Sequence, residues 1–131
     1  MDYARFSQMI LNRGELDGVR LLAPSSVELM GTNVIPKNVL VNSNGTSGLR
    51  FNEAVGFGLD FMVVNYARQA GTNQGDGSLS WGGAAGTWFW VDPTNDLIFV
   101  GMIQRMGGSG GDDLGGMART LTYQALIHPE K

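Results

Sequence analysis

The stretch from residue 77 to residue 104 most constrains how this chain can fold, because it contains three short β segments in succession. The segments cover residues 78–81, 87–91 and 97–104, and they are rich in the aromatic and β-branched side chains that favour strands. Between the last two, the sequence Asp-Pro-Thr-Asn at 92–95 is typical of a type I turn with Pro at its second position. The sequence therefore predicts a tight antiparallel hairpin within an antiparallel meander.

Small residues interrupt this β-rich stretch at residues 81–87, whose sequence is WGGAAGT. Glycine within a strand marks a bulge, or a place where another backbone or a ligand approaches closely. One interpretation is a kinked turn between two strands. The other is a strand edge that is kept bare so that a substrate can lie against it.

Helical patterns come before and after this stretch. Apolar residues at helical spacing predict a helix over residues 2–12, and Pro24 suits the first turn of a second helix that ends near Met30. The Asp-Gly pair at 17–18 is the favoured signal for a type I′ hairpin between the two helices. From Asp113, apolar residues at helical spacing predict a closing helix that lies on one face of the sheet.

The middle of the chain has weaker signals. Residues 56–64 alternate well enough to predict one strand, whereas 32–52 and 66–76 carry turn formers and polar residues and are predicted to be loop and connection. On one face of that strand we expect Phe57, Leu59, Phe61 and Val63. The whole pattern predicts an α+β fold, an antiparallel sheet packed by helices, as a single domain over residues 1–131.

Composition excludes several classes of function. A net charge of −3 and nine scattered Lys and Arg residues give no basic patch for nucleic acid. No apolar run approaches the length of a membrane span. The chain has no cysteine and a single histidine, so we predict no disulfide, no zinc site and no cofactor.

One short motif matches a catalytic pattern by letter. Residues 107–111, GGSGG, fit the G-x-S-x-G nucleophile elbow around Ser109, and Asp112, Asp113 and His128 follow in the order of a Ser, Asp, His triad. A helix that begins at Asp113 would carry His128 to its far end, at about 1.5 Å per residue. We therefore interpret this stretch as a flexible glycine loop.

Three longer stretches resemble a known family: DYARFSQMILNRGELDGVRLLAPSSVELM, VGFGLDFMVV and WGGAAGTWFWVDPTNDLIFVGMIQ. Their order and spacing are similar to the C-terminal half of the serine β-lactamase-like hydrolases, which include class C β-lactamases, D-alanyl-D-alanine peptidases (penicillin-binding proteins) and related esterases. That family uses an S-x-x-K motif, a Tyr- or Ser-led triplet and K-T-G on a strand. Here no serine has Lys three residues on and no tyrosine opens a Tyr-x-Asn triplet, but Trp81-Gly82-Gly83 is similar to the Trp-Gly-Gly form of the third motif. The resemblance implies the C-terminal part of a β-lactamase-related domain, without the N-terminal part that carries the nucleophile.

The resemblance also implies roles for individual residues. Trp81, Gly82 and Gly83 would contact the substrate, and the backbone N–H of Ala84 would be one oxyanion-hole donor. β-Lactamases have Lys and Thr at the first two of these positions, and an indole cannot replace the charge that attracts a substrate carboxylate. The resemblance therefore implies acyl transfer on esters or small amides by the complete protein, and no activity for this chain alone.

Two further expectations concern the edge of the sheet. In the resembled family, the final strand, here residues 97–104, pairs with a strand from the N-terminal part. Without that strand, an apolar edge with no charge from Leu97 to Ile103 would favour self-association. The alternative to an enzyme part is a non-catalytic module that binds a peptide or protein partner along this edge.

Overall fold

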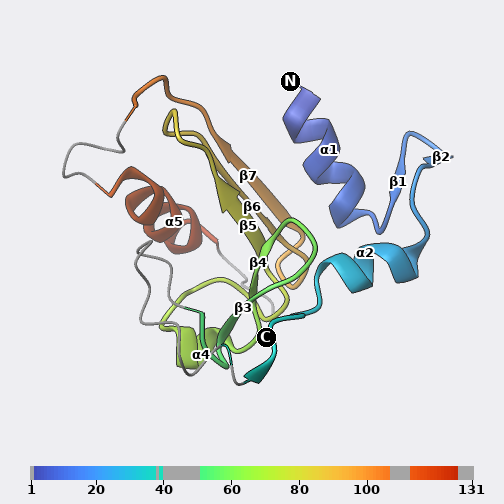
Figure 1. Cartoon of the computed structure of the whole chain (residues 1–131). Coiled ribbons are helices and arrows are strands. Elements are labelled where there is room, and N and C mark those ends of the chain that lie inside the picture. The colour runs from blue at the N-terminus through green and yellow to red at the C-terminus, as the bar shows by residue number, and fades with distance from the viewer. Residues whose placement is uncertain (1, 38, 40–50, 107–112, 127–131) are drawn as a thin grey trace.

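The chain forms an antiparallel sheet with helices on both sides (Figure 1). The computed structural model describes residues 2–37, 39, 51–106 and 113–126. The helices are α1 (Asp2–Leu11), α2 (Pro24–Met30), α4 (Ala67–Ala70) and α5 (Leu114–Gln124). The strands are β1 (Glu15–Leu16), β2 (Val19–Arg20), β3 (Val55–Phe57), β4 (Met62–Val64), β5 (Leu79–Gly82), β6 (Trp88–Asp92) and β7 (Leu97–Gly101).

Five strands form the main sheet in the order β3-β4-β5-β6-β7, and every neighbouring pair is antiparallel. Consecutive strands are therefore neighbours, which confirms the predicted meander and the α+β class. The register places Ser80 opposite Trp90, and Trp90 opposite Phe99. β7 ends at Gly101, three residues earlier than the sequence pattern indicated, and it is the end strand of the sheet in the described part of the chain.

The two faces of the sheet carry different side chains, because successive residues of a strand point to opposite faces. α1 packs on β6 and β7 from one side, whereas α5 lies on the other side (Figure 1). Between α1 and the sheet is an apolar core of Met9, Ile10, Val27, Phe61, Val63, Leu79, Phe89 and Val91. Under α5 the layer is aromatic: the Trp90 ring stacks on Phe99 at 4.2 Å between centroids and on Tyr123 at 6.4 Å.

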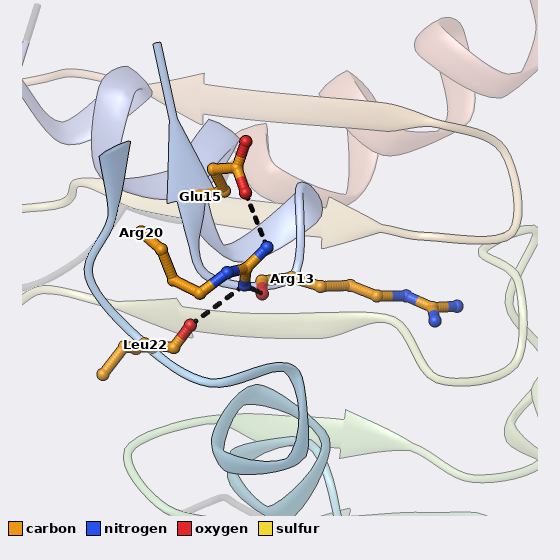
Figure 2. A network of polar contacts seen from close by, with 4 residues as sticks. All are labelled: Arg13, Glu15, Arg20 and Leu22. Carbon is orange, nitrogen blue, oxygen red and sulfur yellow. Dashed lines mark hydrogen bonds and ion pairs between the residues drawn. The ribbon is translucent and has the colours of Figure 1, made fainter. Parts of the chain in front are cut away.

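A small hairpin follows α1, and hydrogen bonds from Arg20 connect it to the end of that helix (Figure 2). Its turn has φ of 52° at Asp17 and 77° at Gly18, as a type I′ turn requires, so the predicted hairpin is confirmed. The Arg20 guanidinium donates to the carbonyl oxygens of Arg13 (3.0 Å) and Leu22 (3.2 Å) and to the Glu15 carboxylate (2.6 Å). One side chain thereby satisfies acceptors from the helix end and from both sides of the hairpin.

The prediction of a single strand over residues 56–64 is wrong. The chain reverses between β3 and β4, where the Gly58 N–H donates to the Phe61 carbonyl at 2.8 Å and Asp60 has φ of 71°. A Cβ at Gly58 would lie 2.0 Å from the Met30 carbonyl oxygen, so only glycine fits there. Leu59 is 45 % exposed in this turn and does not share a buried face with Phe61.

One connection also differs from the sequence expectation, and a second lies partly outside the described residues. The polar stretch 66–76 contains the one-turn helix α4, whose first N–H, that of Ala67, donates to the Asp76 carboxylate at 2.7 Å. Of the predicted loop 32–52, residues 38 and 40–50 lie outside the described residues. The helix predicted from Asp113 is confirmed as α5.

Candidate functional site

The glycine-rich segment after β5 forms a tight turn at one end of the sheet. The Gly83 N–H donates to the Thr87 carbonyl at 2.7 Å, and the Gly86 N–H donates to the Gly83 carbonyl at 2.9 Å. The Arg105 N–H, from the segment after β7, donates to the Ala85 carbonyl at 2.8 Å. Three backbone hydrogen bonds therefore hold a turn whose exposed outer residues include Ala84. Among the described residues, none accepts a hydrogen bond from the Ala84 N–H.

The three glycines of this segment have different structural requirements. Gly86 has φ of 85°, and a Cβ there would lie 2.7 Å from Cδ1 of Ile103. A Cβ at Gly83 would lie 2.5 Å from Oγ1 of Thr87, whereas at Gly82 the nearest described atom would be 3.5 Å away, an ordinary contact. The shape of the turn thus accounts for Gly86 and Gly83. No packing requirement in the described chain accounts for Gly82, which lies bare on the surface.

A pocket of about 170 Å³ opens beside this turn. Its lining comprises Tyr3, Trp81, Gly82, Gly83, Thr87, Trp88, Phe89, Val100, Gly101 and Met102. Trp81 is 37 % exposed, and its ring makes an edge contact with Phe57 at 5.0 Å between centroids. Tyr3 reaches the pocket from α1 and makes an edge contact with Phe89, also at 5.0 Å. The structure thus brings together Trp81, Gly82 and Gly83, which the sequence singled out, with Ala84 exposed directly after them.

The pocket is uncharged. None of its lining residues is an acid, a lysine, an arginine or a histidine. Burial raises the pKa of the Tyr3 phenol above its usual range, so this group is neutral at physiological pH. In the sequence, Tyr3 is one of the residues at helical spacing within the predicted helix 2–12, and no motif marks it. Its position in the pocket depends on how α1 docks on the sheet, for which the sequence carries no local signal.

The other candidate residues do not form a second catalytic cluster in the described part of the chain. Asp113 is the N-cap of α5 and accepts from the Gly116 N–H at 2.8 Å. Ser109, Asp112 and His128 lie outside the described residues, so the glycine-loop interpretation stays a prediction. Within the described ranges, no three His, Cys, Asp or Glu side chains gather as a metal site would require, and no helix has the length and apolar character needed to cross a bilayer.

The family follows from comparison with known proteins. The family model described as Beta-lactamase matches residues 1–124, so the chain belongs to the beta-lactamase family and has the fold of the serine β-lactamase-like hydrolases. Among its relatives are "Uncharacterized protein MT1414" of Mycobacterium tuberculosis strain CDC 1551 and "Protein Rv1367c" of strain H37Rv. Each is 42 % identical over 106 residues, which is 79 % of this chain and 26 % of the relative. The chain thus spans about a quarter of the length of these curated relatives.

Solved structures agree with this fold. "EstCE1, a hydrolase with promiscuous acyltransferase activity" has a TM-score of 0.59 and 24 % identity, covering 79 % of this chain and 24 % of that one. Unliganded "Simvastatin Synthase (LovD)" from Aspergillus terreus has a TM-score of 0.65 and 20 % identity, covering 92 % of this chain and 31 % of that one. At these identities the likeness establishes the fold alone.

Proposed function

We propose that this chain forms one wall of the active site of a serine hydrolase that acts by acyl transfer on esters or small amides. In this proposal Trp81, Gly82 and Gly83 contact the substrate, and the Ala84 N–H is one oxyanion-hole donor. The observation that carries the proposal is an exposed residue, Ala84, whose N–H has no hydrogen-bond partner among the described residues, beside an uncharged pocket lined by the three preceding residues.

The chemistry explains why a backbone N–H matters at this place. When a serine oxygen adds to a carbonyl carbon, the carbonyl electron pair moves to oxygen, which becomes negatively charged. A fixed N–H stabilises that charge, and removal of one such donor costs about 3 kcal/mol of barrier. The bonds from Gly83 to Thr87 and from Gly86 to Gly83 hold the peptide of Ala84 in place, so the donor is oriented before the charge develops.

The lining of the pocket favours a neutral substrate. Trp81 offers an apolar ring, and no described cation lines the pocket to attract a carboxylate. Replacement by lysine would add a charge at the pocket wall, since Trp81 is 37 % exposed. We therefore expect Trp81→Lys to shift preference from a neutral ester toward its carboxylated analogue.

NMR titration of the ¹⁵N-labelled chain tests this assignment without requiring a nucleophile. Methyl butyrate is the neutral ester and monomethyl succinate its carboxylated counterpart. With methyl butyrate we expect shifts of the Ala84 and Gly83 amides and of the Trp81 indole. Ala84→Pro, which removes the N–H, should weaken the interaction, whereas Ala84→Gly, which keeps it, should not. Shifts confined to other residues, or an unchanged ester preference in Trp81→Lys, would show that this turn is not the substrate site.

A second candidate function is supported by the end of the sheet. β7 has a strand partner only on the β6 side in the described part of the chain, so its outer edge offers backbone groups to another strand. Such an edge suits a non-catalytic module that binds an extended peptide. Self-association through β7 would use the same groups.

A further inference from the structure

We propose that the face of the sheet under α5 holds a second binding site, for a small carboxylate with an apolar body. A pocket of about 330 Å³ lies there between the first turns of α5 and strands β4, β5 and β6. The residues that the argument uses are Met62, Ser80, Trp88, Trp90, Asp113 and Arg119, all of which line it. This site is independent of the acyl-transfer proposal, and either can fail without the other.

Ser80 supplies the first observation. It is only 5 % exposed, and its hydroxyl has no hydrogen-bond partner among the described residues. The register of β5 sets Ser80 opposite Met62 on one side and Trp90 on the other, so its side chain points to the face that α5 covers. Buried hydroxyl groups are normally paired, which makes an orphaned one at a pocket wall a sign of a missing partner.

Arg119 supplies the second observation. Its guanidinium carbon lies 5.9 Å from the centre of the Trp90 ring, and its Nε is buried without a hydrogen-bond partner. Across the described ranges, Arg119 forms no ion pair. A cation–π contact uses the charge of a guanidinium and does not use up its N–H groups as hydrogen-bond donors. A cation and a hydroxyl, both lacking acceptors, therefore line the same pocket.

The other lining residues define the chemistry of the ligand. Asp113 brings one negative charge to the pocket rim while it caps α5, which disfavours a dianion such as phosphate. A carboxylate carries a single charge, and its two oxygens match the guanidinium fork. Met62, Trp88 and Trp90 present apolar surface for the rest of the molecule. The indole N–H of Trp88 is also buried without a partner and is a further donor at this wall.

The alternation of side chains separates this site from the first one. Ser80 and Trp90 point toward α5, whereas their neighbours Trp81 and Phe89 point toward α1. The two pockets share Trp81, Trp88 and Phe89 among their lining residues, whereas Ser80, Trp90 and Arg119 line only the second. A substitution in one can leave the side chains of the other in place.

The test is a calorimetric titration of the chain with sodium hexanoate, compared with hexanamide and with inorganic phosphate. We expect hexanoate to bind and the neutral amide and phosphate not to. Arg119→Gln should weaken hexanoate binding about tenfold or more, and Ser80→Ala about threefold, because each removes a hydrogen bond to a charged group. Arg68→Gln is the matched control, since Arg68 is an exposed arginine on α4 that does not line the pocket.

NMR signals locate the bound hexanoate, and thermal unfolding shows whether a variant is still folded. Hexanoate should shift the Arg119 Nε–H and Trp88 indole resonances. Ser80→Ala removes an unpartnered hydroxyl, so its unfolding midpoint should be no lower than that of the parent chain. Equal binding of hexanamide, preferential binding of phosphate, no binding at all, or the same affinity in Arg119→Gln as in Arg68→Gln would each overturn the proposal.

Discussion

Tyr123→Phe removes one hydrogen bond from a carboxylate that is fully buried. Asp92 is 0 % exposed, and it accepts from the N–H groups of Gly75 (2.8 Å), Thr94 (3.0 Å) and Asn95 (3.1 Å). It also accepts from the Asn95 side-chain amide at 2.8 Å and from the Tyr123 hydroxyl at 2.5 Å. A hydrogen bond to a charged group contributes about 1.5–3 kcal/mol. Because four donors remain, we expect the free energy of unfolding to fall by about 1.5–2 kcal/mol, near the lower end of this range.

Asp92→Asn should destabilise the chain more than Tyr123→Phe does. In either orientation of the amide, its NH₂ group replaces an acceptor oxygen that has at least two donors. Oδ1 accepts from Thr94 and Asn95, and Oδ2 from Gly75, Asn95 and Tyr123. Two donors left without an acceptor, at about 1–3 kcal/mol each, give a destabilisation of about 2–6 kcal/mol. Urea unfolding measures both variants, with Tyr66→Phe as the control because Tyr66 is an exposed tyrosine. Equal stability of Tyr123→Phe and Tyr66→Phe would refute the reasoning.

The pH dependence of the same pair gives an independent check. Burial, and then the Asp92 carboxylate, raise the pKa of Tyr123 above its ordinary value. The neutral phenol is thus favoured in the folded state, and its stabilisation is complete below the unfolded pKa of about 10. Above that pH the unfolded chain loses the proton first, so stability falls. The difference in unfolding free energy between the parent and Tyr123→Phe should shrink above pH ~10. A constant difference beyond that pH would contradict the pKa shift.

Three other predictions address the turn, the chemistry and the edge. Gly86→Ala should destabilise the chain by about 1–3 kcal/mol in urea unfolding, because φ is positive and the site is crowded, whereas Gly82→Ala should change stability by less than about 1 kcal/mol. The purified chain should not hydrolyse short-chain p-nitrophenyl esters, since no S-x-x-K is present, and turnover that Ser109→Ala abolishes would revive the nucleophile elbow. Light scattering over a concentration series should show association that Met102→Lys reduces, because Met102 is exposed just after β7. A monomer at every concentration, with or without this charge, would contradict association through β7.

Local patterns predicted most of the elements, because their signals depend on a few neighbouring residues. The Asp-Gly turn, Pro24 at the start of α2 and the spacing in α5 each act within one turn of chain. The single-strand prediction for residues 56–64 is wrong because alternating apolar residues fit a hairpin as well as one strand. What decides between them is Gly58, whose contact with Met30 lies 28 residues away in sequence.

In the candidate site, too, residues adjacent in sequence could be predicted, whereas contacts between distant segments could not. Trp81, Gly82, Gly83 and Ala84 could be singled out because they form one continuous motif. The pocket beside them needs Tyr3 and Met102, which reach it from distant segments. Likewise the orphaned polar groups of Ser80 and Arg119 meet only after α5 docks on the sheet. No spacing rule in the sequence connects such residues.

The two-sided arrangement of the sheet also makes Trp81 and Trp90 spectroscopic reporters of different layers. Trp81 lies in the pocket beside the turn, exposed enough for its emission to respond to solvent and to added quenchers. Trp90 is 1 % exposed and parallel to Phe99, with an interplanar angle of 1°, so its near-ultraviolet dichroism depends on the aromatic layer under α5. Detachment of α5 would change the second signal, because Tyr123 and Arg119 would leave the Trp90 ring, and would spare the first. Single-tryptophan versions of the chain can therefore show whether the two halves of this sandwich separate together or one after the other.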